Sequence, residues 1–300
     1  MQPSSHSPAQ QMPGLQSRRL EDHLVRSLAN FADRLPLAGR FAPIKNLGAA
    51  DVLLGETAAH EALGRRMNQS RLTGRYLNAR IRLFGRRNAT SLIRCELSAD
   101  FREARRRKTP TLLVAWHAGQ LNSLFTGLLR STPDAAILKS SKVHADLEQV
   151  FTVFGTSQSS GNKALENAAQ LKRAVGHLRS GGVLLTFLDG TNGSGSLQVP
   201  FLKEKISLRQ GTTTLARLAG AQVFPCFGRW DSADKRFLFR IGDAVELPEL
   251  CTADSESTLR CLTRLTAPFA QHLQAYPEDI TTETSYLAES TVSDTEKQED

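Results

Sequence analysis

The chain has 300 residues, and its 38 Lys+Arg against 30 Asp+Glu give a formal net charge of +8. That length fits one large domain or two small ones, and the longest apolar stretches, Leu112–Trp116 and Val183–Leu188, are far shorter than the roughly 20 residues that a membrane-spanning helix needs. The four cysteines form no C-x-x-C pair, which argues against a zinc site or a disulfide scaffold and favours a reducing cytoplasm.

The positive charge is concentrated in the first part of the chain. Residues 1–130 hold 21 Lys+Arg, of which 19 are arginine, against 9 Asp+Glu, whereas residues 131–283 hold 16 of each. Arginine suits phosphate recognition, and a cationic face attracts anionic lipid or nucleic acid, although a solvated helical surface explains the charge equally well. The low aromatic content and the lack of a helix-turn-helix, RRM or zinc signature argue against a nucleic-acid-binding protein.

The first elements in chain order are expected to be helical. We predict disorder for residues 1–16, where no signal peptide is visible, and for the acidic tail 284–300, leaving 17–283 as a single domain. An amphipathic helix is predicted for 17–35, which could lie on a membrane surface or face the core. One or two helices broken near Gly74 are expected within 50–85, and a charged helix end over Asp100–Lys108.

From residue 111 onward, strands and helices alternate. Strands are predicted at 111–116, 135–138, 183–188 and 222–228, with a possible partner strand at 236–241. Helices are predicted at 119–130, 144–154, 162–179 and 208–219. This alternation indicates an α/β fold with a largely parallel central sheet flanked by helices.

A histidine and an aspartate stand directly after two of the predicted strands. In α/β sheets the ligand crevice opens at the carboxyl ends of the strands, and His117 occupies such an end with Gly119 beside it. A histidine there can accept a proton from a hydroxyl or amine that attacks a thioester carbonyl. Asp189 follows the strand 183–188, so we expect these two strands to be neighbours and His117 and Asp189 to open onto a common crevice. No histidine belongs to a metal-ligand pattern such as H-E-x-x-H.

Two blocks of sequence together resemble the bacterial late lipid A (lauroyl/myristoyl) acyltransferase family. An apolar strand running into His117-Ala118-Gly119-Gln120-Leu121-Asn122 matches the family's H-x4-D/E motif, except that Asn122 replaces the acid. The second block comprises Leu188-Asp189, Val199-Pro200-Phe201-Leu202, Gly211 and the segment 215–225, LARLAGAQVFP. The resemblance spans roughly residues 75–245.

The resemblance implies a glycerolipid-acyltransferase-like fold and transfer of an acyl group from an acyl carrier protein or coenzyme A thioester to a hydroxyl or amine. His117 would be the general base, Asn122 its orienter or a substrate contact, and Asp189 a structural or substitute acid. Asparagine can hold a histidine tautomer by hydrogen bonding, but it supplies no countercharge. We assign Gly119, Gln120, Asp189, Gly190 and Gly211 to substrate binding, and we expect no metal and no cofactor.

A second hypothesis is a pseudoenzyme on the same fold that binds an acyl chain or a carrier protein without catalysis. The replacement of the motif acid by Asn122 is its main support. Family enzymes begin with a hydrophobic membrane anchor that this chain lacks, so we expect a cytoplasmic protein, either soluble or peripheral on the inner membrane. Its expected partners are the acyl thioester and, through its basic part, an anionic membrane surface, but not nucleic acid.

Overall fold

The computed structural model describes residues 23–27, 30, 50, 53–54, 60–138, 145–155, 163–189, 196–247 and 254–281. The two segments predicted to be disordered, 1–16 and 284–300, lie outside these residues. Of the helix predicted over 17–35, residues 23–27 and 30 are described, and they are helical. Val25 in this helix is buried in the core, which supports the core-facing alternative for that position, whereas Leu24 is exposed.

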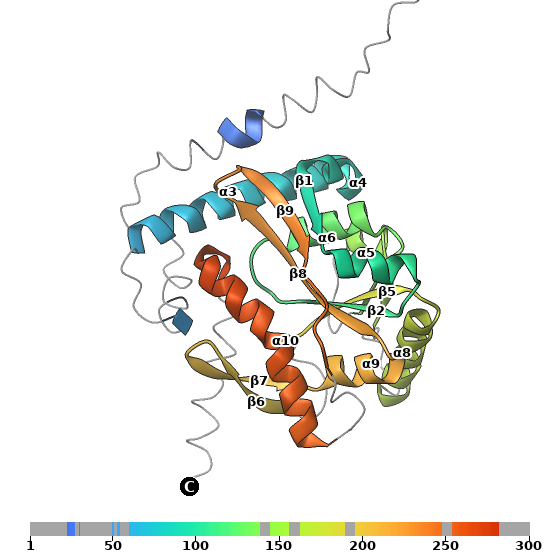
Figure 1. Ribbon diagram of the computed structural model, residues 1–300. Helices are drawn as coiled ribbons and strands as arrows, with labels where there is room; N and C mark the ends of the chain where they lie inside the picture. Colours follow the sequence, from blue (N-terminus) through green and yellow to red (C-terminus); the bar gives the residue numbers. More distant parts are fainter. Residues whose placement is uncertain are drawn as a thin grey trace, which may run out of the picture.

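A seven-stranded sheet is the centre of the described part of the chain (Figure 1). Its strand order is β1-β9-β8-β2-β5-β3-β4, and β8, β2, β5, β3 and β4 run parallel to one another. β9 is antiparallel to β8 and parallel to β1. The predicted α/β class with a largely parallel sheet is therefore confirmed. The strands are β1 (Ile93–Leu97), β2 (Thr111–Ala115), β3 (Ala136–Leu138), β4 (Thr152–Phe154), β5 (Val183–Phe187), β8 (Gln222–Asp231) and β9 (Arg236–Ile241).

Helices cover both faces of this sheet. On one face, α8, α9 and α10 pack in one apolar cluster together with a separate hairpin of β6 and β7. On the other face, α5, α6 and the second half of α3 pack in another cluster. The helices are α3 (His60–Phe84), α4 (Arg86–Ala89), α5 (Ala99–Arg106), α6 (Leu121–Ser131), α7 (Ala145–Glu148), α8 (Lys163–Arg179), α9 (Gly211–Ala219) and α10 (Ser255–Ala275), and the hairpin strands are β6 (Ser196–Phe201) and β7 (Glu204–Arg209).

The central strands are buried on both sides because helices cover both faces. All five residues of β2 are buried, as are the first four of β5, and both strands are continuous apolar runs apart from their threonines. The flanking helices begin where local chemistry satisfies their first N–H groups. Ser98 caps α5 by accepting from the N–H of Phe101 (3.2 Å), and Asp254 caps α10 by accepting from that of Ser257 (2.8 Å).

The structure corrects the predicted helix over 144–154. Only Ala145–Glu148 is helical in the described part of this segment, and Thr152–Phe154 forms β4. β4 adds to the sheet by pairing in parallel with β3, with Val153 opposite Ile137. The β-branched Thr152 and Val153 suit this edge position. Pairing with β3 determines that this short segment is a strand, which its local sequence pattern does not predict.

Two other helix boundaries also differ from the prediction. The helix predicted from residue 208 begins at Gly211, because Leu208 belongs to β7 and is buried opposite Leu197 of β6. α3 runs without interruption through Gly74, where a break was predicted. Gly74 faces the side chain of Gln120, so the missing side chain leaves room for a neighbour and does not end the helix. No helix in the described residues is both long and apolar enough to cross a membrane.

Gly127 lets α6 lie directly on β9, and this contact gives a test of the packing. A Cβ atom at Gly127 would lie 2.1 Å from the Cβ of Phe239, which is fully buried. We expect Gly127→Ala to lower the free energy of unfolding by about 1–3 kcal/mol, the usual cost of overpacking a core. Thermal or denaturant unfolding measures the difference.

Gly176 of α8 provides the matched control, because a Cβ at this helical position would meet nothing within 4 Å. Gly176→Ala should raise stability by roughly 0.5–1 kcal/mol, since alanine has the higher helix propensity. Equal effects of the two substitutions would show that α6 does not pack on β9 as described.

Candidate active site

The register between β2 and β5 places His117 next to Asp189. Ala115 and Phe187 are opposite one another in the parallel pairing, and His117 and Asp189 each follow two residues later. Residues two apart on a strand point to the same face, so both side chains leave the ends of their strands in the same direction. The expectation that the two strands are neighbours is confirmed.

The Asp189 carboxylate holds His117 at two points. Its Oδ1 lies 2.9 Å from Nδ1 of the imidazole, and its Oδ2 accepts the backbone N–H of His117 at 2.8 Å. The Asp189 side chain is 2% exposed, whereas that of His117 is 35% exposed. A buried carboxylate beside Nδ1 favours the tautomer that carries its proton there, so the basic lone pair of the neutral ring resides on Nε2.

Aromatic stacking holds His117 on one face of the sheet and its neighbour Trp116 on the other. The His117 imidazole stacks on Phe187 of β5, with ring centroids 4.2 Å apart and an interplanar angle of 22°. The preceding residue, Trp116, points to the other face and stacks on Phe201 of the hairpin at 4.7 Å. Phe201 belongs to the Val199-Pro200-Phe201 block of the sequence, so that block packs behind the histidine-bearing strand end.

The loop that follows His117 is held by backbone contacts. Gly119 has φ +64°, and a Cβ atom there would lie 2.4 Å from the carbonyl oxygen of Gly228 in β8, so this position requires glycine. The N–H of Gln120 donates to that same carbonyl at 2.7 Å. The amide of Gln120 donates to Ser70 of α3, to its Oγ at 2.8 Å and to its carbonyl.

Asn122 lies in a different polar cluster from the one around the imidazole of His117. Its Oδ1 accepts from Arg86 at 2.7 Å, and its amide donates to Asn78 of α3. Arg86 is 3% exposed and forms an ion pair with Asp146 at 2.6 Å. Burial lowers the pKa of the Arg86 guanidinium from its usual value, and Asp146 acts in the opposite direction. The carboxylate that contacts the His117 ring is therefore that of Asp189, and the side chain of Asn122 contacts Arg86 instead.

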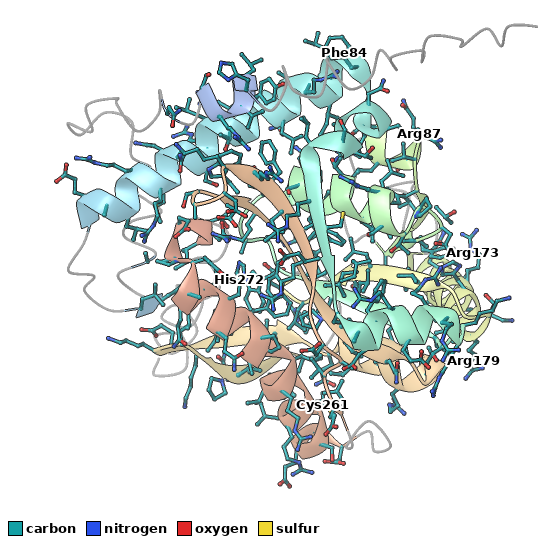
Figure 2. The ribbon with its side chains drawn as sticks, turned by 45° about the horizontal axis from the view of Figure 1, so that its top comes forward. Phe84, Arg87, Arg173, Arg179, Cys261 and His272 are labelled. Carbon is teal, nitrogen blue, oxygen red and sulfur yellow. The ribbon has the colours of Figure 1, made fainter. Side chains whose placement is uncertain are left out.

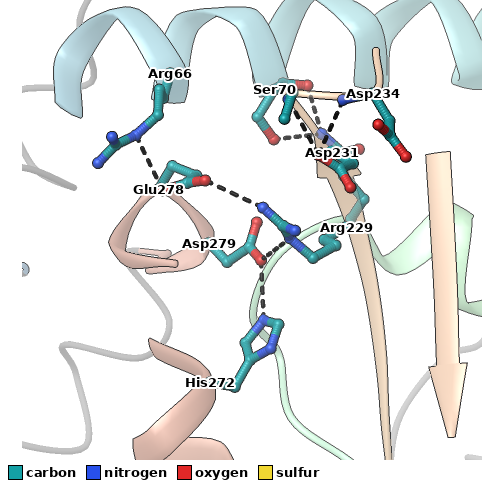
Figure 3. A network of polar contacts seen from close by, with 10 residues as sticks. Arg66, Ser70, Arg229, Asp231, Asp234, His272, Glu278 and Asp279 are labelled. Carbon is teal, nitrogen blue, oxygen red and sulfur yellow. Dashed lines mark hydrogen bonds and ion pairs between the residues drawn. The ribbon is translucent and has the colours of Figure 1, made fainter. Parts of the chain in front are cut away.

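A buried ionic network holds the carboxyl-terminal segment against this loop (Figure 3). Arg229 of β8 contacts Asp279 at 3.3 Å and Glu278 at 3.2 Å, and all three side chains are at most 5% exposed. His272 of α10 lies 2.9 Å from Asp279, and Arg66 of α3 lies 3.2 Å from Glu278. The network therefore ties α3, β8 and α10 to one short turn.

That turn contacts the His117 loop directly. The carbonyl of Asp279 accepts from the N–H of Gly119 at 2.7 Å, and the hydroxyl of Thr281 donates to the carbonyl of His117 at 2.6 Å. No sequence motif marks Arg229, His272, Asp279 or Thr281 as part of the site. The one signal present was the adjacent pair of carboxylates after Tyr276-Pro277, which local patterns do not connect to residue 117.

The remaining predicted substrate-binding residues are not brought together. Gly190 lies outside the described residues. Gly211 begins α9 and is exposed, and Gly119 and Gln120 form the loop described above. Among the described residues, no group of three His, Cys, Asp or Glu side chains could hold a metal ion.

Comparisons with known proteins give one family and a distant structural likeness. The profile of the family "Bacterial lipid A biosynthesis acyltransferase" matches residues 57–281. The structure is similar to the crystal structure of the 1-acyl-sn-glycerophosphate (LPA) acyltransferase, PlsC, from Thermotoga maritima, with a TM-score of 0.40 and 13% identity over 86% of this chain and 98% of that one. None of the curated protein sequences matches the chain.

The buried network predicts a strong dependence of stability on Arg229. Arg229→Met leaves Glu278 and Asp279 buried with less compensating charge, and breaking a buried pair in this way typically costs about 3–5 kcal/mol. We expect a loss of that order in the free energy of unfolding, measured by denaturant titration.

Arg260→Met is the control, since Arg260 pairs with Glu256 on the surface of α10 with side chains 47% and 82% exposed. Removing such an exposed pair should change stability by less than about 1 kcal/mol. A similar small loss for both variants would contradict a structural role for the network.

Proposed function

Since the chain belongs to the bacterial lipid A biosynthesis acyltransferase family, we propose that it transfers an acyl group from the thioester of an acyl carrier protein or coenzyme A to a hydroxyl or amine. The observation that carries this proposal is the contact between His117 and Asp189 at the carboxyl ends of two adjacent parallel strands. A half-exposed imidazole backed by a buried carboxylate is an arrangement suited to general base catalysis.

In the proposed reaction, Nε2 of His117 takes the proton of the acceptor hydroxyl or amine as the oxygen or nitrogen attacks the thioester carbonyl. The Asp189 carboxylate stabilises the imidazolium that forms and keeps the ring in one orientation. When the tetrahedral intermediate collapses, the carbon–sulfur bond breaks, and the imidazolium returns its proton to the departing thiolate. The products are the acylated acceptor and the free thiol, and the step requires no metal or redox cofactor.

The replacement of the motif acid by Asn122 does not support the pseudoenzyme hypothesis, because the His117 ring has another carboxylate beside it. That hypothesis rested on a histidine without a carboxylate, and Asp189 supplies one two residues after the end of β5. Asn122 instead accepts from Arg86, whose charge Asp146 already balances. We therefore propose that Asp189 performs the orienting role that the family motif gives to the residue at position 122, and that Asn122 helps to place α6.

Substrate contacts of Gly119, Gln120, Gly190 and Gly211 remain part of the proposal. Gly119 and Gln120 stand in the loop after His117, where their own N–H groups already donate to the carbonyls of Asp279 and Gly228, so a substrate would contact other atoms of this loop. Gly211 begins α9, and a Cβ atom there would meet nothing within 4 Å, which leaves room for a substrate. The basic first part of the chain suits the phosphates of coenzyme A, an acidic carrier protein or an anionic membrane surface.

Three substitutions test the assignment of roles. His117→Ala and Asp189→Asn should each lower the rate of acyl transfer by about 10²–10⁴, the usual contribution of a general base and its orientation. Asn122→Asp should keep most of the wild-type rate, because the new carboxylate meets Arg86. The measurement is thiol release from a panel of acyl-coenzyme A and acyl carrier protein thioesters, with bacterial lysate as the source of acceptor.

Circular dichroism of each variant controls for loss of folding. Wild-type turnover that survives His117→Ala would rule out the proposed mechanism. A loss in Asn122→Asp as large as that in Asp189→Asn would return the orienting role to position 122.

A further inference from the structure

The carboxyl-terminal end of α3 exposes two adjacent large apolar side chains. Leu83 is 74% exposed and Phe84 is 56% exposed, and they are two of the four large apolar side chains that are exposed in the described part of the chain. Phe84 lies at the outer rim of the molecule, where α3 ends and α4 begins, and Leu83 precedes it in α3 (Figure 2). An adjacent exposed Leu–Phe pair at a helix end marks a candidate interaction site.

Arginines surround this apolar pair, and acidic residues are absent from its stretch of sequence. Between Glu61 and Glu96 the chain has nine arginines and no Asp or Glu. Arg82 and Arg87 are exposed beside the pair, and the guanidinium of Arg80 lies over the Phe84 ring, 4.1 Å from its centroid. We call Leu83 and Phe84, together with Arg80, Arg82 and Arg87, the α3 tip.

We propose that the α3 tip is the site at which this protein docks on an anionic lipid bilayer. Leu83 and Phe84 would enter the boundary between headgroups and acyl chains, while the arginines bind the phosphates of the headgroups. This pairing of apolar side chains with a cationic rim matches the two components of an anionic bilayer surface, and neither component alone would explain both features.

The shape of the tip favours a bilayer over a protein partner. A stable protein interface buries about 800 Å² per partner and involves roughly 20–30 residues on each side. The α3 tip is a helix end with two adjacent exposed apolar side chains and exposed arginines, far fewer residues than such an interface uses. A pair of exposed apolar side chains suits insertion into a fluid surface, which needs no shape complementarity.

The tip is close enough to the site for docking to serve the proposed function, on which this inference rests. Asn78 of α3 contacts Asn122, which follows His117 by five residues. Phe84 is six residues beyond Asn78, or about 9 Å along the helix axis at 1.5 Å per residue. A bilayer at the tip would therefore lie on the side of the molecule where α3 meets Asn122 at the start of α6, five residues after His117, which is the side where an acceptor on a lipid headgroup would have to approach.

A second described helical segment, residues 23–27, shares an apolar cluster with α3. Val25 is buried in the same apolar cluster as Leu77 and Ile81 of α3, while its neighbours Leu24 and Arg26 are exposed. Leu24 and Arg26 are thus a further exposed apolar side chain and a further exposed basic one, next to a residue that packs in the same cluster as α3.

Vesicle co-sedimentation of the full chain tests the proposal. Wild-type protein should bind vesicles of phosphatidylglycerol and phosphatidylcholine, bind pure phosphatidylcholine weakly, and dissociate as salt is raised. Leu83→Ser/Phe84→Ser should weaken binding at least about tenfold, because two large side chains no longer leave water. Arg82→Glu/Arg87→Glu should weaken it at low salt by about fivefold or more per residue, with a smaller difference at high salt.

Arg217→Glu/Leu218→Ser is the matched control, since Arg217 and Leu218 form another exposed Arg–Leu pair, on α9. This variant should bind vesicles as wild type does. Tip variants that bind as wild type does, or wild-type protein that ignores anionic vesicles, would overturn the proposal. Tip variants that lose binding to an acyl carrier protein but keep vesicle binding would also overturn it and assign the tip to the carrier.

Thiol release in the absence of vesicles separates this proposal from the proposed function. Leu83→Ser/Phe84→Ser should turn over a thioester with a soluble acceptor at the wild-type rate, because neither residue belongs to the catalytic site. Failure of the catalytic proposal would appear as thiol release that is indifferent to His117→Ala, whatever the vesicles show.

Discussion

The parallel register between β2 and β5 brings His117 and Asp189 together, and the rest of the site depends on it. Parallel pairing means that both strands end at the same edge of the sheet, and alternation along each strand turns both side chains the same way. A shift of one residue in this register would point the carboxylate to the face of Trp116 and leave the histidine without it. The burial of both strands on two faces makes such a shift costly, so the geometry of the His117–Asp189 pair is fixed by the same packing that stabilises the core.

The buried network around Arg229 fixes the other side of the loop. Two carboxylates and a guanidinium with side chains at most 5% exposed lose much of their hydration, and their mutual contacts offset that loss only while all of them stay in place. The segment 277–281, which contains the two carboxylates of the network, also makes two hydrogen bonds to the loop after β2. The carbonyl of Asp279 accepts from the N–H of Gly119, and the hydroxyl of Thr281 donates to the carbonyl of His117. The carboxyl-terminal turn thereby restricts the position of a loop that begins some 160 residues earlier in the chain.

Arg86 explains why an amide is compatible with position 122. Its guanidinium is buried, one carboxylate already balances it, and it also donates to the hydroxyl of Thr126 at 3.0 Å. Asparagine supplies a neutral acceptor for Arg86 and a donor for Asn78, so this cluster satisfies its polar groups without adding a charge. The carboxylate that contacts His117 is instead that of Asp189, which follows β5.

The sequence by itself determined the α/β class, most of the strands and helices, and the two strand ends that carry His117 and Asp189. These features follow from local patterns: unbroken apolar runs, helical spacing, and the glycines and prolines between them. The tertiary structure alone decided that Asp189 is the partner of His117, because their contact joins residues 72 positions apart and depends on strand order and register. It also decided that Thr152–Phe154 and Leu208 are in strands, that Arg229 joins the carboxyl-terminal turn, and that Leu83 and Phe84 remain exposed. Each of these outcomes depends on the tertiary contacts that a residue makes, and the local sequence of a short segment does not specify those contacts.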